Sequence, residues 1–177
     1  MKFRSKRNEV FLQGGVVHKH TQTALQEAAV LQLLLARGVR VPRVLDCHEN
    51  LLVLEHLPGE PLPDLIEHGG YDPKKLSDAL HDWFADFHVA CPGKSRGDVN
   101  GRNFLYDGHL VYGIDFEEAL QPGTHAQDAG RLAAFLATYH TQHPQKQTAL
   151  LHTFLHDDMQ PAFLQELNEI KKRRPPA

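Results

Sequence analysis

The sequence predicts an α+β fold in which a small sheet lobe is followed by a mainly helical lobe. Short β-prone runs dominate the first part of the chain, and amphipathic helical stripes dominate the rest. A Pro/Gly-rich break at residues 58–61 separates the two regions. The 177 residues are enough to bury a core, and we expect the lobes to span residues 1–57 and 58–177.

Two pairs of strands are predicted in the first lobe. Residues 10–12 and 16–20 are β-prone runs that flank Gly14-Gly15, and a two-residue loop of this kind is typical of a hairpin. Residues 44–47 and 51–55 form the second pair, which is joined by a short polar turn. The first lobe is therefore expected to be built on a sheet.

A helix is predicted between these two pairs, and it brings a lysine and a glutamate together. Thr21 or Thr23 can cap this helix, which runs to about Arg37. Glu27 lies on its apolar face, where a carboxylate is costly unless it is paired. Lys19 falls in the preceding strand, where a charged side chain beside apolar residues also requires an explanation. We therefore expect a Lys19–Glu27 ion pair, with a strand-edge lysine and a solvated glutamate as the alternative.

The second lobe is predicted to be helical around one small hairpin. Residues 76–87 have the spacing of a helix with one buried face. Residues 104–106 and 110–114 bracket Asp107-Gly108, which is a strong hairpin-turn signal. Further helices are expected at residues 132–139, 150–155 and 163–170.

Three polar residues lie at loop ends around that hairpin. Asp98 follows Gly97 and precedes an Asn-Gly turn, so a loop can present its carboxylate. Asn103 precedes one strand of the hairpin and Asp115 follows the other, which places the two close in space. A carboxylate and an amide at a strand end form a natural site for a hard cation. Each residue alone is readily explained as a turn residue, but the joint spacing favours phosphoryl-transfer chemistry.

The order of these features resembles the protein-kinase-like superfamily. The resemblance rests on Lys19 and Glu27, on the run at residues 51–55 that enters a Pro/Gly hinge, and on two motifs, Gly97-Asp98-x-x-x-x-Asn103 and Ile114-Asp115-Phe116-Glu117. It is closer to compact members, such as aminoglycoside phosphotransferases, lipopolysaccharide core kinases and the small atypical kinase of the KEOPS assembly. This resemblance implies a two-lobed fold with a truncated N-terminal sheet lobe and a mainly helical C-terminal lobe.

The resemblance also implies roles for the site residues. Asp98 would be the catalytic base, and Asn103 and Asp115 would be the magnesium ligands. Lys19 would bind the phosphates of ATP, held in place by Glu27. The expected cofactors are therefore ATP and Mg²⁺.

Four further positions follow from the same resemblance. The backbone at Glu55 and Leu57 would bind the adenine edge. Asp128 resembles the acid that braces the catalytic loop, with a helix-start acid favoured by the helix dipole as an equal alternative. Arg96 stands where the family usually has histidine, so the contact that braces this loop is expected to differ. The metal motif ends in Glu117 where ordinary protein kinases have glycine.

The leading function is an ATP- and magnesium-dependent phosphotransferase. Only thirteen positions separate Asp115 from Asp128, which leaves no long activation segment for docking peptides. We therefore expect the acceptor to be a hydroxyl of a small molecule or glycan. The alternatives are an atypical Ser/Thr protein kinase that acts in a complex, and a non-catalytic nucleotide-binding scaffold. The scaffold alternative arises because Gly14-Gly15 is not a full glycine-rich loop.

The composition limits the binding partners and the cellular compartment expected for the protein. The formal net charge of −3 gives no general attraction to nucleic acid, and no apolar run approaches transmembrane length. Two cysteines in unrelated apolar segments indicate free thiols, so a cytoplasmic protein is expected. The thirteen histidines are expected to be mostly solvated, with zinc binding by His18/His20 or His152/His156 as the alternative.

Overall fold

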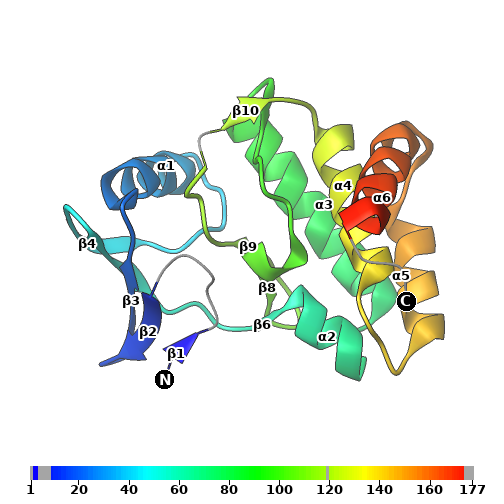
Figure 1. Cartoon of the computed structure of the whole chain (residues 1–177), viewed down its shortest axis with the longest axis horizontal. Helices are drawn as coiled ribbons and strands as arrows, with labels where there is room; N and C mark the ends of the chain where they lie inside the picture. Colours follow the sequence, from blue (N-terminus) through cyan, green and yellow to red (C-terminus); the bar gives the residue numbers. More distant parts are fainter. Residues whose placement is uncertain (1, 4–8, 119, 174–177) are drawn as a thin grey trace.

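The structure, a computed structural model, describes residues 2–3, 9–118 and 120–173 (Figure 1). Its N-terminal part is an antiparallel sheet with one helix, and its C-terminal part is mainly helical (Figure 1). The predicted α+β fold class is therefore confirmed, while the lobe boundary after Leu57 stays a prediction. Within the described residues, no helix has both the length and the apolar character needed to cross a lipid bilayer.

The N-terminal sheet has five strands in the order β1-β2-β3-β5-β4, and all neighbours are antiparallel. The predicted hairpin is confirmed, because Gln13 pairs with Val16 and leaves Gly14-Gly15 as its loop. Both glycines have positive φ values, of 62° and 82°, which suit a two-residue turn. Strand β1 was not predicted, because two residues carry no periodic pattern. The strands are β1 (Lys2–Phe3), β2 (Glu9–Gln13), β3 (Val16–His20), β4 (Val44–His48) and β5 (Leu51–Glu55).

Helix α1 (Ala24–Ala36) confirms the predicted helix and packs against β4 and β5. Leu31 and Leu34 are fully buried in the same apolar cluster as Leu52 of β5. Thr23 is the residue before the helix, but its side chain makes no capping hydrogen bond. Thr23 therefore occupies the predicted cap position, but the predicted side-chain hydrogen bond of the cap is wrong. Gly38, with φ of 83°, lets the chain turn after the helix.

The C-terminal part surrounds the small hairpin with helices. Its described helices are α2 (Leu62–His68), α3 (Pro73–Ala90), α4 (His125–Thr138), α5 (Pro144–Phe154) and α6 (Gln160–Arg173), with short 3₁₀ turns η1 (Gly101–Asn103) and η2 (Asp157–Met159). The predicted hairpin is β8 (Phe104–Tyr106) with β9 (Val111–Gly113), and β6 (Glu60–Pro61) extends it. A separate pair joins β7 (Lys94–Ser95) to β10 (Gln121–Pro122). Helix α2 was missed because it is short and follows the proline-rich break.

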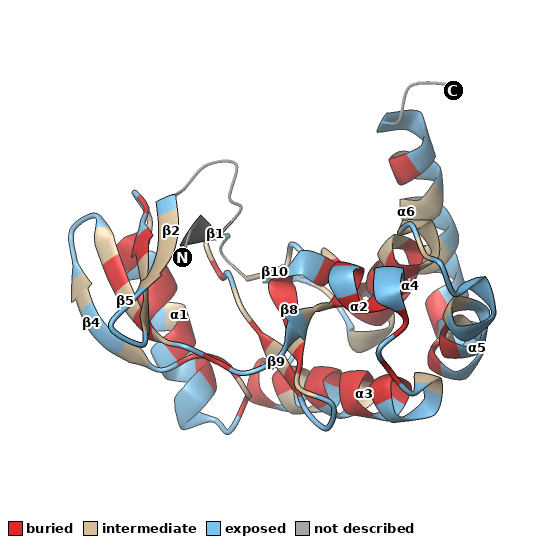
Figure 2. Ribbon diagram, turned by 90° about the horizontal axis from the view of Figure 1, so that it is seen from below, coloured by how far each residue is buried: buried red, intermediate tan, exposed pale blue. Residues whose placement is uncertain are grey.

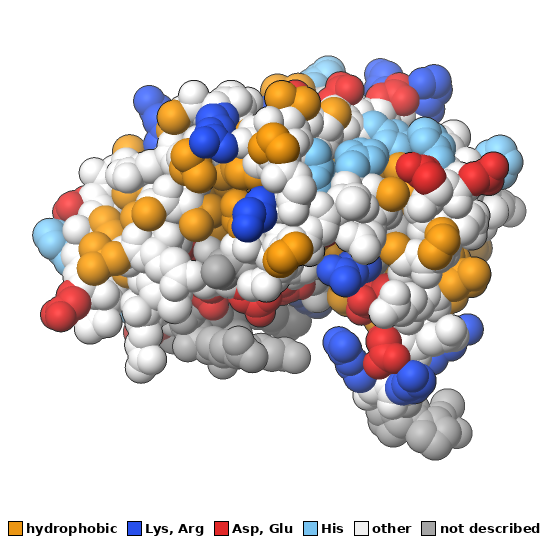
Figure 3. All heavy atoms as spheres, turned by 90° about the horizontal axis from the view of Figure 1, so that it is seen from above, with side chains coloured by type: hydrophobic (Ala, Val, Ile, Leu, Met, Phe, Trp, Pro, Cys, Tyr) orange, Lys and Arg blue, Asp and Glu red, His pale blue; other side chains and the backbone are white. Residues whose placement is uncertain are grey.

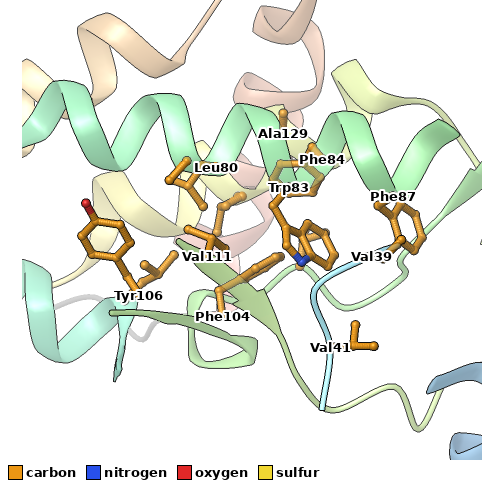
Figure 4. Packing of buried hydrophobic residues seen from close by; sticks show 14 of the residues in the cluster. Val39, Val41, Leu80, Trp83, Phe84, Phe87, Phe104, Tyr106, Val111 and Ala129 are labelled. Atoms are coloured by element: carbon orange, nitrogen blue, oxygen red, sulfur yellow. The ribbon is translucent and has the colours of Figure 1, made fainter. Parts of the chain in front are cut away.

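The hairpin is held against α3 by aromatic packing. Trp83 meets Phe104 edge to face, with ring centroids 5.0 Å apart (Figure 4). Gly113 lies so close that a Cβ there would stand 2.3 Å from the Trp83 ring. Buried residues run along the whole of α3 (Figure 2), and each large apolar side chain contributes about 1.5–3 kcal/mol. This packing fixes the hairpin whose ends carry Asn103 and Asp115.

Four histidines gather where α3, α4 and η2 meet. Ring centroids are 4.7 Å apart for His81 and His156, 6.3 Å for His81 and His125, and 5.7 Å for His88 and His125. Figure 3 shows histidine side chains gathered on one face of the molecule. Burial, followed by repulsion from neighbouring histidines, lowers the pKa of both His81 and His125. The fold therefore favours the neutral forms of His81 and His125.

We predict that the free energy of unfolding falls in mild acid because of this cluster. The pKa values of His81 and His125 lie below their ordinary value of about 6.5 in the folded chain, so the unfolded chain binds more protons. Stability is then complete above about pH 6.5 and is lost as the pH falls below it. Urea denaturation at pH 7.5 and 5.5 measures this loss. The loss should shrink in His81→Gln but not in the exposed control His152→Gln, and equal losses would contradict the account.

Candidate functional site

A buried ion pair lies where β3 meets α1. The Lys19 Nζ donates to both carboxylate oxygens of Glu27, at 3.1 Å to Oε1 and 2.8 Å to Oε2. Glu27 is 0% exposed and Lys19 is 5% exposed. The predicted pairing is therefore present. It is needed because a buried carboxylate without a partner would cost roughly 3–5 kcal/mol.

The Lys19 ammonium also binds two carboxylates that follow β9. Its Nζ lies 2.8 Å from Asp115 Oδ1 and 2.8 Å from Glu117 Oε1. Burial lowers the pKa of Lys19, but attraction to Glu27 and Asp115 outweighs burial, so the pKa is raised and the ammonium stays charged. Glu117 was not expected at the site. The only sequence signal for it is the acid that replaces glycine at the end of the motif.

The loop that carries Asp115 is tied to helix α1 by its backbone. The Phe116 amide donates to Glu27 Oε1 at 3.0 Å, so one buried carboxylate binds both Lys19 and this loop. Asp115 itself has a φ of 64°, the left-handed region that non-glycine residues rarely adopt. Strained residues of this kind cluster at functional sites, where the surrounding structure holds them. The conformation places the Asp115 carboxylate on Lys19.

Asp98 lies on an exposed loop, as predicted. Its Oδ1 accepts a hydrogen bond from the Asn100 amide at 3.0 Å, so it also makes the turn contact expected of an ordinary loop aspartate. The Tyr139 hydroxyl lies 3.0 Å from Asn100 Oδ1 and accepts from the Gly101 amide at 2.9 Å. These bonds hold the loop in one shape, and they leave the Asp98 carboxylate facing solvent.

Asn103 connects this loop to the loop that carries Asp115. It is 8% exposed, and its Nδ2 donates to the Asp98 carbonyl oxygen at 3.2 Å. Its own carbonyl accepts from the Ile114 amide at 2.9 Å, next to the pairing of Phe104 with Gly113. The hairpin therefore brings Asn103 beside the residue that precedes Asp115, which is the proximity that the sequence predicted.

Arg96 binds the backbones of both loops at once. Its guanidinium is buried and donates to the carbonyls of Asp98, Asn103, Ile114 and Asp115, with distances of 3.4 Å to Asn103 and 3.3 Å to Asp115. It also lies between two rings, 4.9 Å from the Phe104 centroid and 4.6 Å from the Phe116 centroid. Burial lowers the pKa of Arg96 to about 10, which still leaves it charged near neutral pH. The contact that braces this loop was expected to differ from the family's, because arginine replaces histidine here. The guanidinium of Arg96 supplies that contact.

Asp128 supports the same loop from below. It is 0% exposed in the first turn of α4, and it accepts from the Ser95 hydroxyl and, at 3.0 Å, from the Arg96 amide. His88 Nε2 lies 3.2 Å from the same carboxylate. Asp128 is therefore an acid in the first turn of a helix and also a brace for the loop. Both alternatives given for its position are correct.

The carboxylates around Lys19 fit a hard cation. Oxygen atoms of Glu27, Asp115 and Glu117 lie within 4.8 Å of one another. Carboxylate and amide oxygens suit Mg²⁺ or Mn²⁺ rather than a soft metal. Among the described residues this is the only such acidic or histidine group, so neither predicted zinc alternative is assembled in the fold.

Glu55 and Leu57 lie where β5 leaves the sheet. The Glu55 amide donates to the Arg43 carbonyl at 2.9 Å, and its side chain pairs with the Arg43 guanidinium at 3.2 Å. Leu57 is buried. The adenine-binding role of this segment stays a prediction.

Comparison with known proteins identifies one family model that matches the chain. A family model described as the RIO domain matches residues 4–133. A search of curated proteins finds no significant match.

Solved structures resemble the whole fold. APH(2″)-IIa in a ternary complex with streptomycin and ATP has a TM-score of 0.65 at 11% identity, covering 97% of this chain and 84% of that one. The ADP-bound aminoglycoside phosphotransferase APH(2″)-Ib has a TM-score of 0.63 at 11% identity, covering 98% and 86%. A choline/ethanolamine kinase family protein from Mesorhizobium loti has a TM-score of 0.59 at 13% identity, covering 87% and 68%. At these identities the likeness establishes the fold alone. The RIO domain match, together with this fold, confirms the predicted resemblance to the protein-kinase-like superfamily.

We predict that Arg96→Lys lowers the free energy of unfolding by about 2–3 kcal/mol. A lysine ammonium cannot span the carbonyls that the guanidinium reaches, so buried acceptors lose charged donors. Urea denaturation measures the loss. The control Arg43→Lys changes an exposed arginine that pairs with Glu55, and it should change stability by no more than about 0.5 kcal/mol. Equal losses in the two variants would contradict the bridging role of Arg96.

Proposed function

The chain belongs to the RIO domain family, and from that premise we propose that it is an ATP- and Mg²⁺-dependent phosphotransferase. The observation that carries the proposal is the meeting of the Lys19–Glu27 pair with Asp115 at one end of the hairpin. The Asp98 loop is tied to the same place by Arg96. This set joins a phosphate-binding cation, hard-cation ligands and a solvent-facing carboxylate.

Each residue of this set has one role in the proposal. Lys19 binds nucleotide phosphates once a carboxylate of the loop after β9 releases it, while Glu27 stays. Asn103 and Asp115 would hold the magnesium ion, which would neutralise charge on the transferred phosphoryl group. Asp98 accepts the proton of the acceptor hydroxyl and orients its oxygen toward the phosphorus. Glu27 keeps Lys19 charged and positioned.

ATP is the proposed phosphoryl donor. APH(2″)-IIa and APH(2″)-Ib, which share this fold, were solved with ATP and ADP respectively. In this chain the adenine edge would meet the backbone at Glu55 and Leu57, where β5 leads into the segment before β6.

The proposed acceptor is a hydroxyl of a small molecule or glycan. Helix α4 begins at His125, ten positions after Asp115, and the described chain between them includes β10, which is paired with β7. So short a connection offers little surface for docking a peptide. The aminoglycoside phosphotransferase and choline/ethanolamine kinase family names of the similar structures agree with a small-molecule acceptor.

Two other functions have specific support. The RIO domain match favours an atypical Ser/Thr protein kinase that acts in a complex. A non-catalytic nucleotide-binding scaffold is favoured by the contacts of Asp98 and Lys19, because Asp98 makes a turn bond and the Lys19 ammonium binds carboxylates.

We predict that Asp98→Asn lowers the rate of phosphoryl transfer or ATP hydrolysis by about 10²–10⁴-fold, because the loop loses its proton acceptor. Labelled ATP with Mg²⁺ measures the rate, and ATP affinity should stay nearly unchanged. The control Asp64→Asn, on the exposed first turn of α2, should behave as wild type. A wild-type rate no higher than that of Asp98→Asn, with ATP binding intact, would favour the scaffold.

We also predict that the acceptor is found among small molecules. A panel of sugars, aminoglycosides and Ser/Thr proteins, each incubated with labelled ATP, compares the acceptor classes directly. Labelled sugar or aminoglycoside that is absent with Asp98→Asn supports the proposal. Transfer to protein alone would replace it with the protein-kinase alternative.

A further inference from the structure

The Lys19 ammonium has no donor to spare for a phosphate. Its three N–H groups face Glu27, Asp115 and Glu117, each at 2.8 Å. A phosphate can bind Lys19 only if one of these carboxylates leaves. The negative charges of these carboxylates also repel a phosphate, because one ammonium among three carboxylates leaves a net charge of −2.

Glu27 is the partner that stays. It is fully buried, and it also accepts the Phe116 amide at 3.0 Å, so its departure would leave two buried groups without partners. The carboxylates that can leave are those of the loop after β9. The side chain of Asp115 is 44% exposed and that of Glu117 is 21% exposed.

The two loop carboxylates differ in how their backbones are held. The backbone of Asp115 is held on both sides, by Arg96 at the Ile114 and Asp115 carbonyls and by the Phe116 amide bond to Glu27. Glu117 lies one residue beyond that anchor and has the longer side chain. Its side chain can therefore rotate away from Lys19 while its backbone, whose carbonyl accepts from Gln26 Nε2 at 3.5 Å, stays beside Asp115.

We propose that Glu117 is a carboxylate gate, which occupies Lys19 until a nucleotide arrives and then becomes an oxygen ligand of the divalent cation beside Asp115. The inference rests on the proposed function, and it adds a residue that the family motif does not supply. With a cation bound beside Asp115, the Glu117 carboxylate would leave Lys19, and the freed N–H group would be available to phosphate. Nucleotide and cation binding are then coupled through one side chain.

Two binding measurements on Glu117→Gln test this role, with Glu118→Gln as the control of equal charge change one residue further on. ADP titrated without divalent cation should bind Glu117→Gln at least about fivefold tighter than Glu118→Gln, because the competitor for Lys19 is weakened. Mn²⁺ titrated without nucleotide should bind Glu117→Gln at least about fivefold more weakly than Glu118→Gln, because a charged ligand is lost.

Each measurement decides one half of the inference. Equal ADP affinities in the two variants would overturn the competition for Lys19, and equal Mn²⁺ affinities would overturn the role as a cation ligand. If neither the wild type nor any variant bound ADP with Mg²⁺ present, the proposed function and the competition with nucleotide would fail together. The Mn²⁺ comparison would still decide the ligand role, because it requires no nucleotide.

Discussion

The fully buried Glu27 carboxylate of α1 binds two other parts of the chain, the strand before its helix and a loop 89 residues further along. It receives the Lys19 ammonium from β3 and the Phe116 amide from the loop after β9, while its own helix packs on the sheet. Because a buried carboxylate stripped of its partners would cost several kcal/mol, roughly 3–5 in comparable cases, the sheet, α1 and the loop are held to one relative placement. That placement brings Asp115 to Lys19.

A second buried charge performs the same task on the other side of the site. Arg96 binds carbonyls of the Asp98 loop and of the Asp115 loop, and Asp128 holds the Arg96 amide from helix α4. Neither charge faces the solvent. Arg96 acts through backbone carbonyls, and Glu27 acts through the Lys19 ammonium and one backbone amide. The candidate site is therefore a set of exposed carboxylates whose positions are set by buried ions, which is the arrangement that phosphoryl transfer needs.

Local patterns predicted the parts of the site that depend on local geometry. Helical periodicity put Glu27 on a buried face, which required Lys19, and the Asp107-Gly108 turn predicted the hairpin that joins Asn103 to Asp115. The contacts of Arg96 could not be predicted, because they depend on where two separate loops pass one side chain. Glu117 was noticed only as a departure from a motif, since nothing in the sequence shows that its carboxylate reaches Lys19. Asp128 stayed ambiguous because a helix-start acid and a buried brace have the same local sequence.

The central claim is that Lys19 exchanges loop carboxylates for nucleotide phosphate while Glu27 stays in place. A crystal structure with Mn²⁺ and a non-hydrolysable ATP analogue tests it most directly, because anomalous scattering locates the metal. The account predicts manganese on the oxygens of Asn103, Asp115 and Glu117, a phosphate on Lys19, and an unchanged Lys19–Glu27 pair. Nucleotide bound away from Lys19, with Asp115 and Glu117 still on the ammonium, would contradict it.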